Sequence, residues 1–372
     1  MLANELMTRP ELERRLARRT LALINIPSVS RSESAILALL EREAAGVACF
    51  RGRSVPGQGL LLWPAARRDR PLVLLVGHVD TVPEQGNLPG REERGWIHGL
   101  GASDMKGGLA VMLELAEWLE RERPNVSTDV ALLFFAREEL PITESAVPAI
   151  FAACPELRQA NLTIVMEPTD GAVQVGCLGN LNARLVFRGK SAHSARPWQG
   201  INALHAAIQG LQGLAGVPQR EVDIGGLTYV EVLNLTQIHG GVANNVLPDE
   251  VACGLNFRYA PNCTPAQAEQ RLRALVPAGA ELEIVGNAPP ARAAVDNPLL
   301  GQLRAAGALE LQPKQAWTPV AEFSAEGLDA INYGPGATAQ AHQKAECVEI
   351  AALARGFDVL RQFLLAPATV AS

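Results

Sequence analysis

An apolar run that ends in a histidine and an aspartate constrains the fold of this chain more than any other segment. The run is Pro71-Leu-Val-Leu-Leu-Val-Gly-His78-Val-Asp80-Thr-Val-Pro83, and its β-branched and aliphatic residues predict a buried parallel strand. Open α/β sheets place their active sites at the carboxyl ends of strands, where His78 lies. Asp80 points the same way two residues later. Its carboxylate can hold the second imidazole nitrogen, as beside many metal-bound histidines; the alternative is a polar loop that simply follows a strand.

Other segments carry the same kinds of side chain in comparable places. Acidic residues and a second histidine lie at or after the ends of further apolar runs: Glu138, Glu139, Glu167 and His342. Asp104 lies in a glycine-rich turn just before a long predicted helix. Any one of these residues is ordinary, but together they form a set of nitrogen and oxygen donors suited to zinc or a similar divalent ion.

The order of the apolar patterns predicts an α/β protein with an inserted domain. Strands near 72–77, 129–136 and 161–167 alternate with helical patterns such as 107–123, which predicts a doubly wound, mostly parallel sheet. Residues 176–289 have a different pattern, with two helices and four strands, one of them alternating apolar and polar residues as in an antiparallel sheet. We therefore expect a discontinuous catalytic domain, 1–175 and 290–372, interrupted by an α+β insert at 176–289.

Composition limits the function classes. The chain has 372 residues, 48% of them hydrophobic, and a net charge of −6, with no basic run of the kind that binds nucleic acid. The first ten residues lack a signal-peptide core, and no apolar segment is long enough to span a bilayer. These features predict a soluble, cytoplasmic protein with no membrane partner. The six cysteines form no C-x-x-C pair, so we expect buried thiols and not a thiolate metal site.

The motifs resemble those of the M20 family of di-zinc aminoacylases and peptidases. The resemblance covers about residues 15–365 and includes His78-x-Asp80, Gly-x-x-Asp104-Met-Lys-Gly-Gly, Glu138-Glu139, Glu167-Pro168 and the late His342. Within the family, Gly176-Cys-Leu-Gly179, the segment 192–203 and Val230-Glu-Val-Leu-Asn234 look most like the succinyl-diaminopimelate desuccinylases of the actinobacterial type. The resemblance implies a ferredoxin-like insert that acts as a lid and dimerisation domain, and hence a homodimer.

The resemblance also implies a role for each motif residue. Asp104 would bridge two metal ions, with His78 and Glu167 completing one site and Glu139 and His342 the other. Zinc is favoured by ligand type, and cobalt or manganese would fit similar ligands. Glu138 would be the general base that takes a proton from water and delivers it to the leaving amine.

Three residues of the insert match family positions that contact the substrate. His193 would donate to the oxyanion, in many members from the partner subunit, although its sequence also fits a surface histidine. Arg258 would bind a substrate carboxylate, for which a planar guanidinium is suited, and Asn245 would be a further contact. For Arg258 and Asn245 the alternative is a structural hydrogen bond or ion pair.

The predicted function is hydrolysis of an N-acyl amino acid, with N-succinyl-LL-2,6-diaminopimelate of lysine biosynthesis as the favoured small-molecule substrate. Acetylornithine-type deacetylases and M20 carboxypeptidases share the cluster and stay as alternatives, as does a non-catalytic binding protein that kept the fold. Leu178 and Glu322 occupy positions where some desuccinylases carry arginine. These departures leave the metal ligands intact but remove two positive groups that would favour a substrate with several carboxylates.

Overall fold

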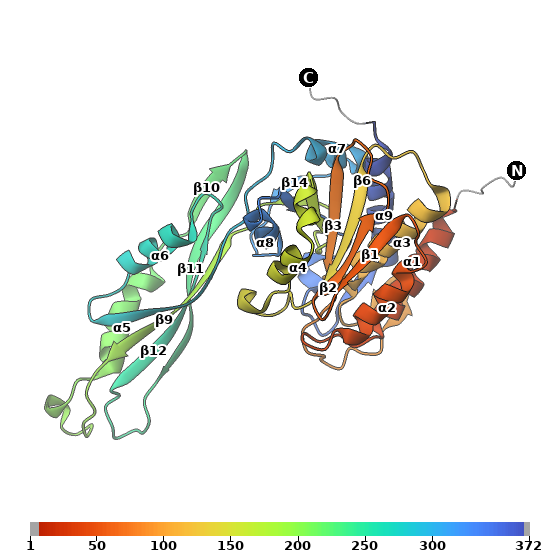
Figure 1. Ribbon diagram of the computed structural model, residues 1–372. Coiled ribbons are helices and arrows are strands. Elements are labelled where there is room, and N and C mark those ends of the chain that lie inside the picture. The colour runs from red at the N-terminus through yellow and green to blue at the C-terminus, as the bar shows by residue number, and fades with distance from the viewer. Residues whose placement is uncertain (1–6, 368–372) are drawn as a thin grey trace, which may run out of the picture. The chain divides into compact units, whose positions relative to one another are not determined.

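The computed structural model describes residues 7–367, which form two compact units (Figure 1). The first unit holds the described residues up to Val175, Ala294–Gln312 and the described residues from Glu322 onward, and the second holds Gly176–Ala293 and Pro313–Ala321. Residues 1–6, part of the stretch in which the sequence shows no signal-peptide core, lie outside the described residues.

The first unit is built on an eight-stranded sheet with the order β1-β2-β6-β3-β7-β15-β8-β14. Its strands are β1 (Phe50–Val55), β2 (Gly59–Pro64), β3 (Leu72–His78), β6 (Asp129–Phe135), β7 (Leu162–Val165), β8 (Val173–Val175), β14 (Leu311–Pro313) and β15 (Ala330–Asn332). The central strands β6, β3, β7 and β15 run parallel, whereas β2 and β8 add to them in the antiparallel sense. The predicted α/β fold with a mostly parallel sheet is confirmed.

The two central strands β3 and β6 are apolar along nearly their whole length, and every residue in them is buried. Their parallel register pairs Leu72 with Asp129 and His78 with Phe135. His78 at the end of β3 and the glutamates after β6 therefore emerge at the same edge of the sheet. Strands buried on both faces require helices on both sides.

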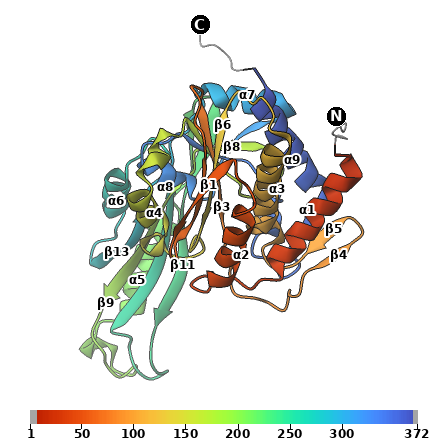
Figure 2. The same ribbon diagram turned by 45° about the vertical axis from the view of Figure 1, so that its right-hand side comes forward.

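Helices cover both faces of this sheet. They are α1 (Arg9–Ile24), α2 (Ser34–Ala44), α3 (Gly107–Glu122), α4 (Val147–Ala153), α7 (Pro298–Gly307), α8 (Val320–Ala325) and α9 (Ile350–Leu365). Figure 2 shows α1, α2, α3 and α9 on one side of the sheet. On the other side, the Phe151 ring of α4 lies 5.7 Å from that of Phe323, which lies 6.4 Å from Phe135 of β6. In the described part of the chain, no helix is both long and apolar enough to cross a membrane.

A small second sheet ties the Asp104 region to the region after His342. Its strands are β4 (Arg91–Glu93), β5 (Trp96–His98) and β16 (Cys347–Glu349), in the order β16-β5-β4. Both pairings are antiparallel, and Cys347 lies opposite His98. Short helical turns also occur, at Ala102–Lys106, Ile142–Glu144, Pro155–Gln159, Pro197–Gln199 and Thr338–Gln340.

The second unit is an antiparallel sheet with two helices. Its strands are β9 (Gly179–Arg188), β10 (Arg220–Ile224), β11 (Leu227–Gly240), β12 (Glu250–Tyr259) and β13 (Ala280–Ala288), in the order β10-β11-β12-β9-β13, and its helices are α5 (Ala203–Ala215) and α6 (Pro265–Ala274). Without β10, the chain order is that of a ferredoxin-like domain. The sequence predicts four strands and misses β10, because only Val222 of that short, charged strand is buried.

The boundary between the units differs from the one predicted at residue 290. The chain returns to the first unit at Ala294, and Pro313–Ala321 belongs to the second unit. Contacts within the second unit account for this: Trp317 Nε1 donates to the Pro289 carbonyl at 3.0 Å, and the Gln315 amide oxygen accepts from the Val230 N–H at 3.3 Å. Such contacts join segments far apart in the chain, so no local pattern reports them.

All six cysteines are free thiols. Cys154, Cys177, Cys253 and Cys263 are buried, whereas Cys49 and Cys347 are half-buried.

Candidate metal centre

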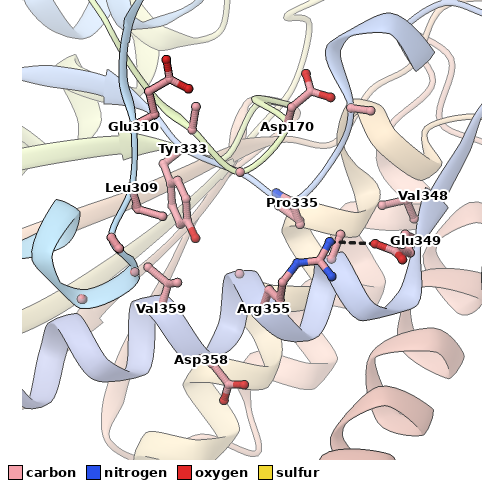
Figure 3. Close-up of a pocket in the computed structure, with 18 of the residues that line it drawn as sticks. Asp170, Leu309, Glu310, Tyr333, Pro335, Val348, Glu349, Arg355, Asp358 and Val359 are labelled. Atoms are coloured by element: carbon pink, nitrogen blue, oxygen red, sulfur yellow. Dashed lines mark hydrogen bonds and ion pairs between the residues drawn. The ribbon is translucent and has the colours of Figure 1, made fainter.

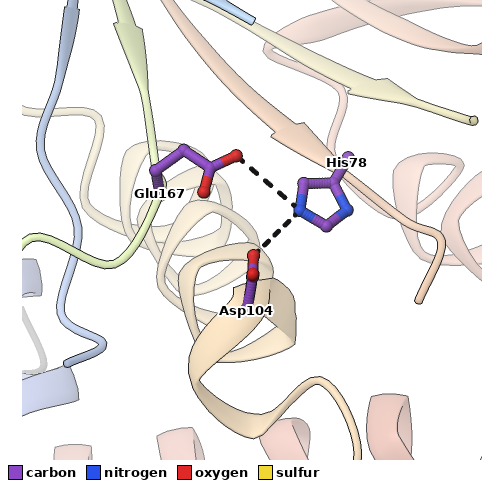
Figure 4. A group of neighbouring side chains, drawn as sticks. All are labelled: His78, Asp104 and Glu167. Carbon is purple, nitrogen blue, oxygen red and sulfur yellow. Dashed lines mark hydrogen bonds and ion pairs between the residues drawn. The ribbon is translucent and has the colours of Figure 1, made fainter. Parts of the chain in front are cut away.

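His78, the last residue of β3, is the innermost member of the centre, with a side chain that is 1% exposed. Its Nε2 atom lies 3.1 Å from Oδ1 of Asp104 and 3.7 Å from Oε1 of Glu167. Figure 4 shows both carboxylates converging on this nitrogen. Asp104 comes from the turn before α3, and Glu167 follows β7. Three distant segments thus place one imidazole and two carboxylates around one point.

A second group of donors shares Asp104. His342 Nε2 lies 3.0 Å from Oε2 of Glu139 and 3.6 Å from Oδ2 of Asp104. Its hydrogen bond to Glu139 raises the pKa of His342 to about 9. Asp104 therefore presents one oxygen to His78 and the other to His342. A carboxylate in this position can bind two cations, one through each oxygen.

These donors fit two divalent cations. The ligand atoms of His78, Asp104 and Glu167 lie within 4.8 Å of one another, and so do those of Asp104, Glu139 and His342. Imidazole nitrogens and carboxylate oxygens are suitable ligands for zinc and related ions. Carboxylates this close repel one another unless a cation or a proton lies between them. The two groups coincide with the two ligand sets that the family resemblance implies.

Glu138 lies beside the same cluster. With His78 and Glu139 it forms a further group whose ligand atoms lie within 4.8 Å of one another. Distance alone therefore does not decide which of the two adjacent glutamates is a metal ligand and which is the general base. Loss of solvation raises the pKa of Glu138 well above its ordinary value, and the charges of Glu167, Glu139 and Asp104 add to this, while His78 opposes it. A carboxylate whose proton affinity is raised is suited to proton transfer near neutral pH.

Asp80 organises the glutamate pair as well as the histidine. Its carboxylate accepts hydrogen bonds from the backbone N–H groups of Glu138 at 3.0 Å and Glu139 at 3.1 Å, and from Ser30 Oγ at 2.7 Å. The nearest acceptor to His78 Nδ1 is the Asp80 backbone carbonyl at 3.1 Å, with the carboxylate 3.6 Å away. The expected contact with His78 thus comes mainly from the backbone, and the carboxylate fixes Glu138 and Glu139 in place.

The insert residues expected at the substrate belong to the second unit and are described within it. His193 and Val246 form a β-bridge, and the Ser194 N–H donates to the Asn245 carbonyl at 2.9 Å, so the His193 and Asn245 segments lie side by side. Both residues are exposed. Arg258 on β12 is half-buried and donates from Nε to Asn256 Oδ1 at 2.9 Å.

The half-buried Arg258 guanidinium has no carboxylate neighbour within the described residues. Burial lowers the pKa of Arg258, which reflects the cost of holding a cation away from water. A guanidinium in this state is suited to binding an acidic group.

Three side chains that support the centre were not identified from the sequence. Ser30 contacts Asp80, as above. Lys106 is 2% exposed and donates from Nζ to the Ile26 carbonyl at 2.9 Å, and burial lowers its pKa to about 8. Glu346 accepts hydrogen bonds from the turn that carries Asp104. Lys106 lies inside the Asp104 motif, but neither Ser30 nor Glu346 has a local pattern that could have marked it.

A cleft of about 870 Å³ in the first unit contains none of the ligand residues (Figure 3). Tyr333 and Pro335 line it, and Arg355 pairs with Glu349 at its wall.

Two glycines of the loop after β15, Gly334 and Gly336, pack closely against neighbouring backbone. A Cβ added at Gly334 would lie 2.3 Å from the Met166 carbonyl oxygen, and one added at Gly336 would lie 2.5 Å from the Ser103 carbonyl oxygen. These glycines therefore let the loop pack closely against the segments that carry Glu167 and Asp104.

An α/β unit with clustered histidines and carboxylates at its strand ends, interrupted by a ferredoxin-like unit, defines a class of metal-dependent hydrolases. The model of the peptidase family M20/M25/M40 matches residues 74–366. The chain belongs to this family of hydrolases.

Relatives with assigned names point to one branch of the family. A Mycobacterium tuberculosis protein named as a succinyl-diaminopimelate desuccinylase is 37% identical over 350 residues, covering 93% of this chain and 96% of the relative. The succinyl-diaminopimelate desuccinylase of Corynebacterium glutamicum is 34% identical, covering 93% and 95%.

Solved structures share the fold. A tripeptidase from Staphylococcus aureus has a TM-score of 0.79 at 19% identity, covering 95% of this chain and 97% of its own. A dinuclear metal-binding peptidase of family M20 from Bacillus subtilis has a TM-score of 0.70 at 18% identity, covering 96% and 98%.

Glu322, at one of the two positions where some desuccinylases carry arginine, is a buried carboxylate of the first unit. It is 8% exposed, and burial raises its pKa to about 7 despite a hydrogen bond with Ser145. Because the folded pKa lies above the unfolded value near 4.5, the unfolded chain loses this proton first as the pH rises. Glu322 therefore lowers the stability of the fold progressively between about pH 4.5 and 7, and the cost persists above that range.

We predict that Glu322→Gln removes this pH dependence. Relative to the wild type, the variant should gain up to about 3 kcal/mol of unfolding free energy at pH 8 and much less at pH 5, because one pKa unit corresponds to about 1.4 kcal/mol. Urea unfolding at both pH values, with a chelator present, measures the difference. Glu326→Gln removes the nearby carboxylate that pairs with Arg158 and serves as the control. An equal gain at both pH values for Glu322→Gln would contradict the assignment.

Proposed function

We propose that this M20 hydrolase cleaves N-succinyl-LL-2,6-diaminopimelate to succinate and LL-2,6-diaminopimelate, a reaction of lysine biosynthesis. The observation that carries the proposal is the pair of ligand groups that share Asp104, in a chain 37% and 34% identical, over 93% of its length, to relatives named as succinyl-diaminopimelate desuccinylases. The metal groups support hydrolysis, and the relatives support the acyl group and the amino acid.

Two divalent ions, zinc in the first place, would be held by the two groups. His78, Asp104 and Glu167 would hold one, and Asp104, Glu139 and His342 the other. When bound, such ions supply Lewis-acid polarisation of the amide carbonyl and make water more acidic. With two dipositive ions, the three ligand carboxylates leave a nearly balanced charge, which suits a cluster that is largely buried.

Glu138 is the general base in this proposal. It takes a proton from the attacking water and delivers it to the nitrogen of the leaving amine, so that the amide C–N bond breaks and the carboxylate of succinate forms. Asp80 holds the N–H groups of both glutamates, which keeps Glu139 available as a ligand while Glu138 faces the reacting groups. His193 would donate a hydrogen bond to the carbonyl oxygen as its negative charge develops.

Substrate recognition falls to the second unit. Arg258, half-buried and without a carboxylate neighbour in the described residues, would bind a substrate carboxylate, and Asn245 would add a polar contact. The family resemblance supports a homodimer formed through the second unit, in which the partner subunit supplies His193. Because Leu178 and Glu322 replace arginines of some desuccinylases, Arg258 has a larger share of the carboxylate recognition here than it would in those relatives.

Turnover of two substrates tests the proposal. The zinc-loaded protein should release succinate from N-succinyl-LL-2,6-diaminopimelate with a kcat/KM at least about tenfold above that for N-acetylornithine, a difference of about 1.4 kcal/mol in transition-state binding. A chelator should abolish the activity. Preference for the acetyl substrate would reject the succinyl specificity, and activity that persists in the chelated protein would reject the metal-dependent mechanism.

We predict that Glu138→Gln removes the base without removing metal. The amide keeps the size of the side chain but cannot accept the proton, so kcat should fall by about 10²–10⁴-fold while two metal ions per chain stay bound. Elemental analysis beside steady-state kinetics measures both quantities. Glu144→Gln, a carboxylate on the same loop that pairs with Arg31, is the matched control. Loss of metal from Glu138→Gln would instead make Glu138 a ligand.

A further inference from the structure

Glu346 is a buried carboxylate that binds the backbone of the turn carrying Asp104. The residue is 2% exposed. Its Oε2 accepts a hydrogen bond from the Gly101 N–H at 2.8 Å, and its Oε1 accepts from the Ser103 and Asp104 N–H groups, both at 2.9 Å. One side chain therefore fixes the backbone at and before Asp104.

The turn that Glu346 fills has the geometry of an anion-binding concavity. Gly101 has a left-handed backbone, with φ of 81°, and N–H groups of neighbouring residues then point to a common centre. Here the accepting oxygens are supplied by the chain itself, from a carboxyl group 242 positions beyond Asp104. This arrangement satisfies the buried N–H groups within the chain, and the Asp104 side chain faces His78 and His342.

Two further hydrogen bonds join the turn that carries Asp104 to the loop that carries His342. The Gly99 N–H donates to the Glu346 carbonyl at 3.0 Å, and Ser103 Oγ donates to the Ala337 carbonyl at 3.1 Å. His342 lies between these two anchored positions, and its side chain is 55% exposed. It therefore depends on its loop for its position, whereas His78 is buried at the end of a central strand.

The two proposed metal sites therefore depend on Glu346 to different degrees. In the Asp104–Glu139–His342 group, two of the three ligands lie on segments that Glu346 anchors. In the His78–Asp104–Glu167 group, only Asp104 lies on such a segment, because His78 ends strand β3 and Glu167 follows strand β7 of the main sheet.

We propose that Glu346 is a positioning residue that sets the metal affinity of the Glu139–His342 site more strongly than that of the His78–Glu167 site. The inference rests on the proposed two-metal centre. It assigns to a residue outside both ligand groups the task of orienting the bridging carboxylate and the more exposed histidine together. Residues behind metal ligands commonly change affinity by about 10- to 100-fold when replaced.

Calorimetric titration of the metal-free protein with Co²⁺ alone tests the proposal. The wild type should bind two equivalents. Glu346→Gln keeps the size of the side chain but replaces one accepting oxygen with an NH₂ group that faces the backbone N–H donors. One of the two sites should weaken by about 10- to 100-fold and the other by no more than about threefold. Glu349→Gln, three residues further on and paired with Arg355, should bind like the wild type.

A double variant identifies which site is affected. His342→Ala removes a ligand of the Asp104–Glu139–His342 site and should leave one Co²⁺ site. Adding Glu346→Gln should then change the affinity of that remaining site by no more than about threefold. Glu346→Asp keeps the charge and should restore part of the lost affinity. If Glu346→Gln does not fold, Glu346→Asp carries the test, because its shorter side chain should weaken the same site alone.

The outcomes separate this inference from the proposed function. Equal weakening of both sites, or two sites of wild-type affinity in the Glu346 variants, would overturn the positioning inference while leaving the metal centre intact. A wild-type protein that binds fewer than two Co²⁺ ions would instead reject the two-metal centre itself.

Discussion

The Asp104 carboxylate, set between two imidazoles, is the contact on which the rest of the centre depends. Its Oδ1 faces His78 at 3.1 Å and its Oδ2 faces His342 at 3.6 Å. Each imidazole also lies beside a second carboxylate, Glu167 or Glu139. Because both donor groups include Asp104, a small displacement of this one side chain would disturb both. The neighbouring segments therefore have to hold its backbone, and Glu346 does so through the N–H groups of the turn.

The main sheet explains why these residues meet. Parallel strands β3, β6 and β7 end at one edge, so His78, the glutamate pair and Glu167 emerge together, and Asp80 adds hydrogen bonds that fix the pair. His342 comes from the part of the chain that follows the second unit. The first unit must therefore be completed by chain on both sides of that unit before the cluster can form. We expect folding of the first unit and assembly of the metal centre to be coupled for this reason.

The strands of the fold could be predicted from the sequence wherever the burial of their residues follows a local pattern. β3 and β6 are continuous apolar runs, and the alternation along β12 reports a sheet with one buried face. The division of the ligands into two sets that share Asp104 is predicted by the motif resemblance and not by any local pattern. Other features depend on contacts between distant segments: Pro313–Ala321 joins the second unit through Trp317 and Gln315, and Ser30 and Glu346 reach the centre from segments without periodicity. The exposed strand β10 was missed because one buried valine does not make a pattern.

The most direct test of the central claim is diffraction from zinc-loaded crystals, recorded on both sides of the zinc absorption edge. The account predicts two anomalous peaks, one beside each Asp104 carboxylate oxygen, about 3.5–4 Å apart, with His78 and Glu167 at one and Glu139 and His342 at the other. A single peak, or two peaks of which only one contacts Asp104, would contradict the bridging carboxylate and with it the proposed two-metal hydrolysis.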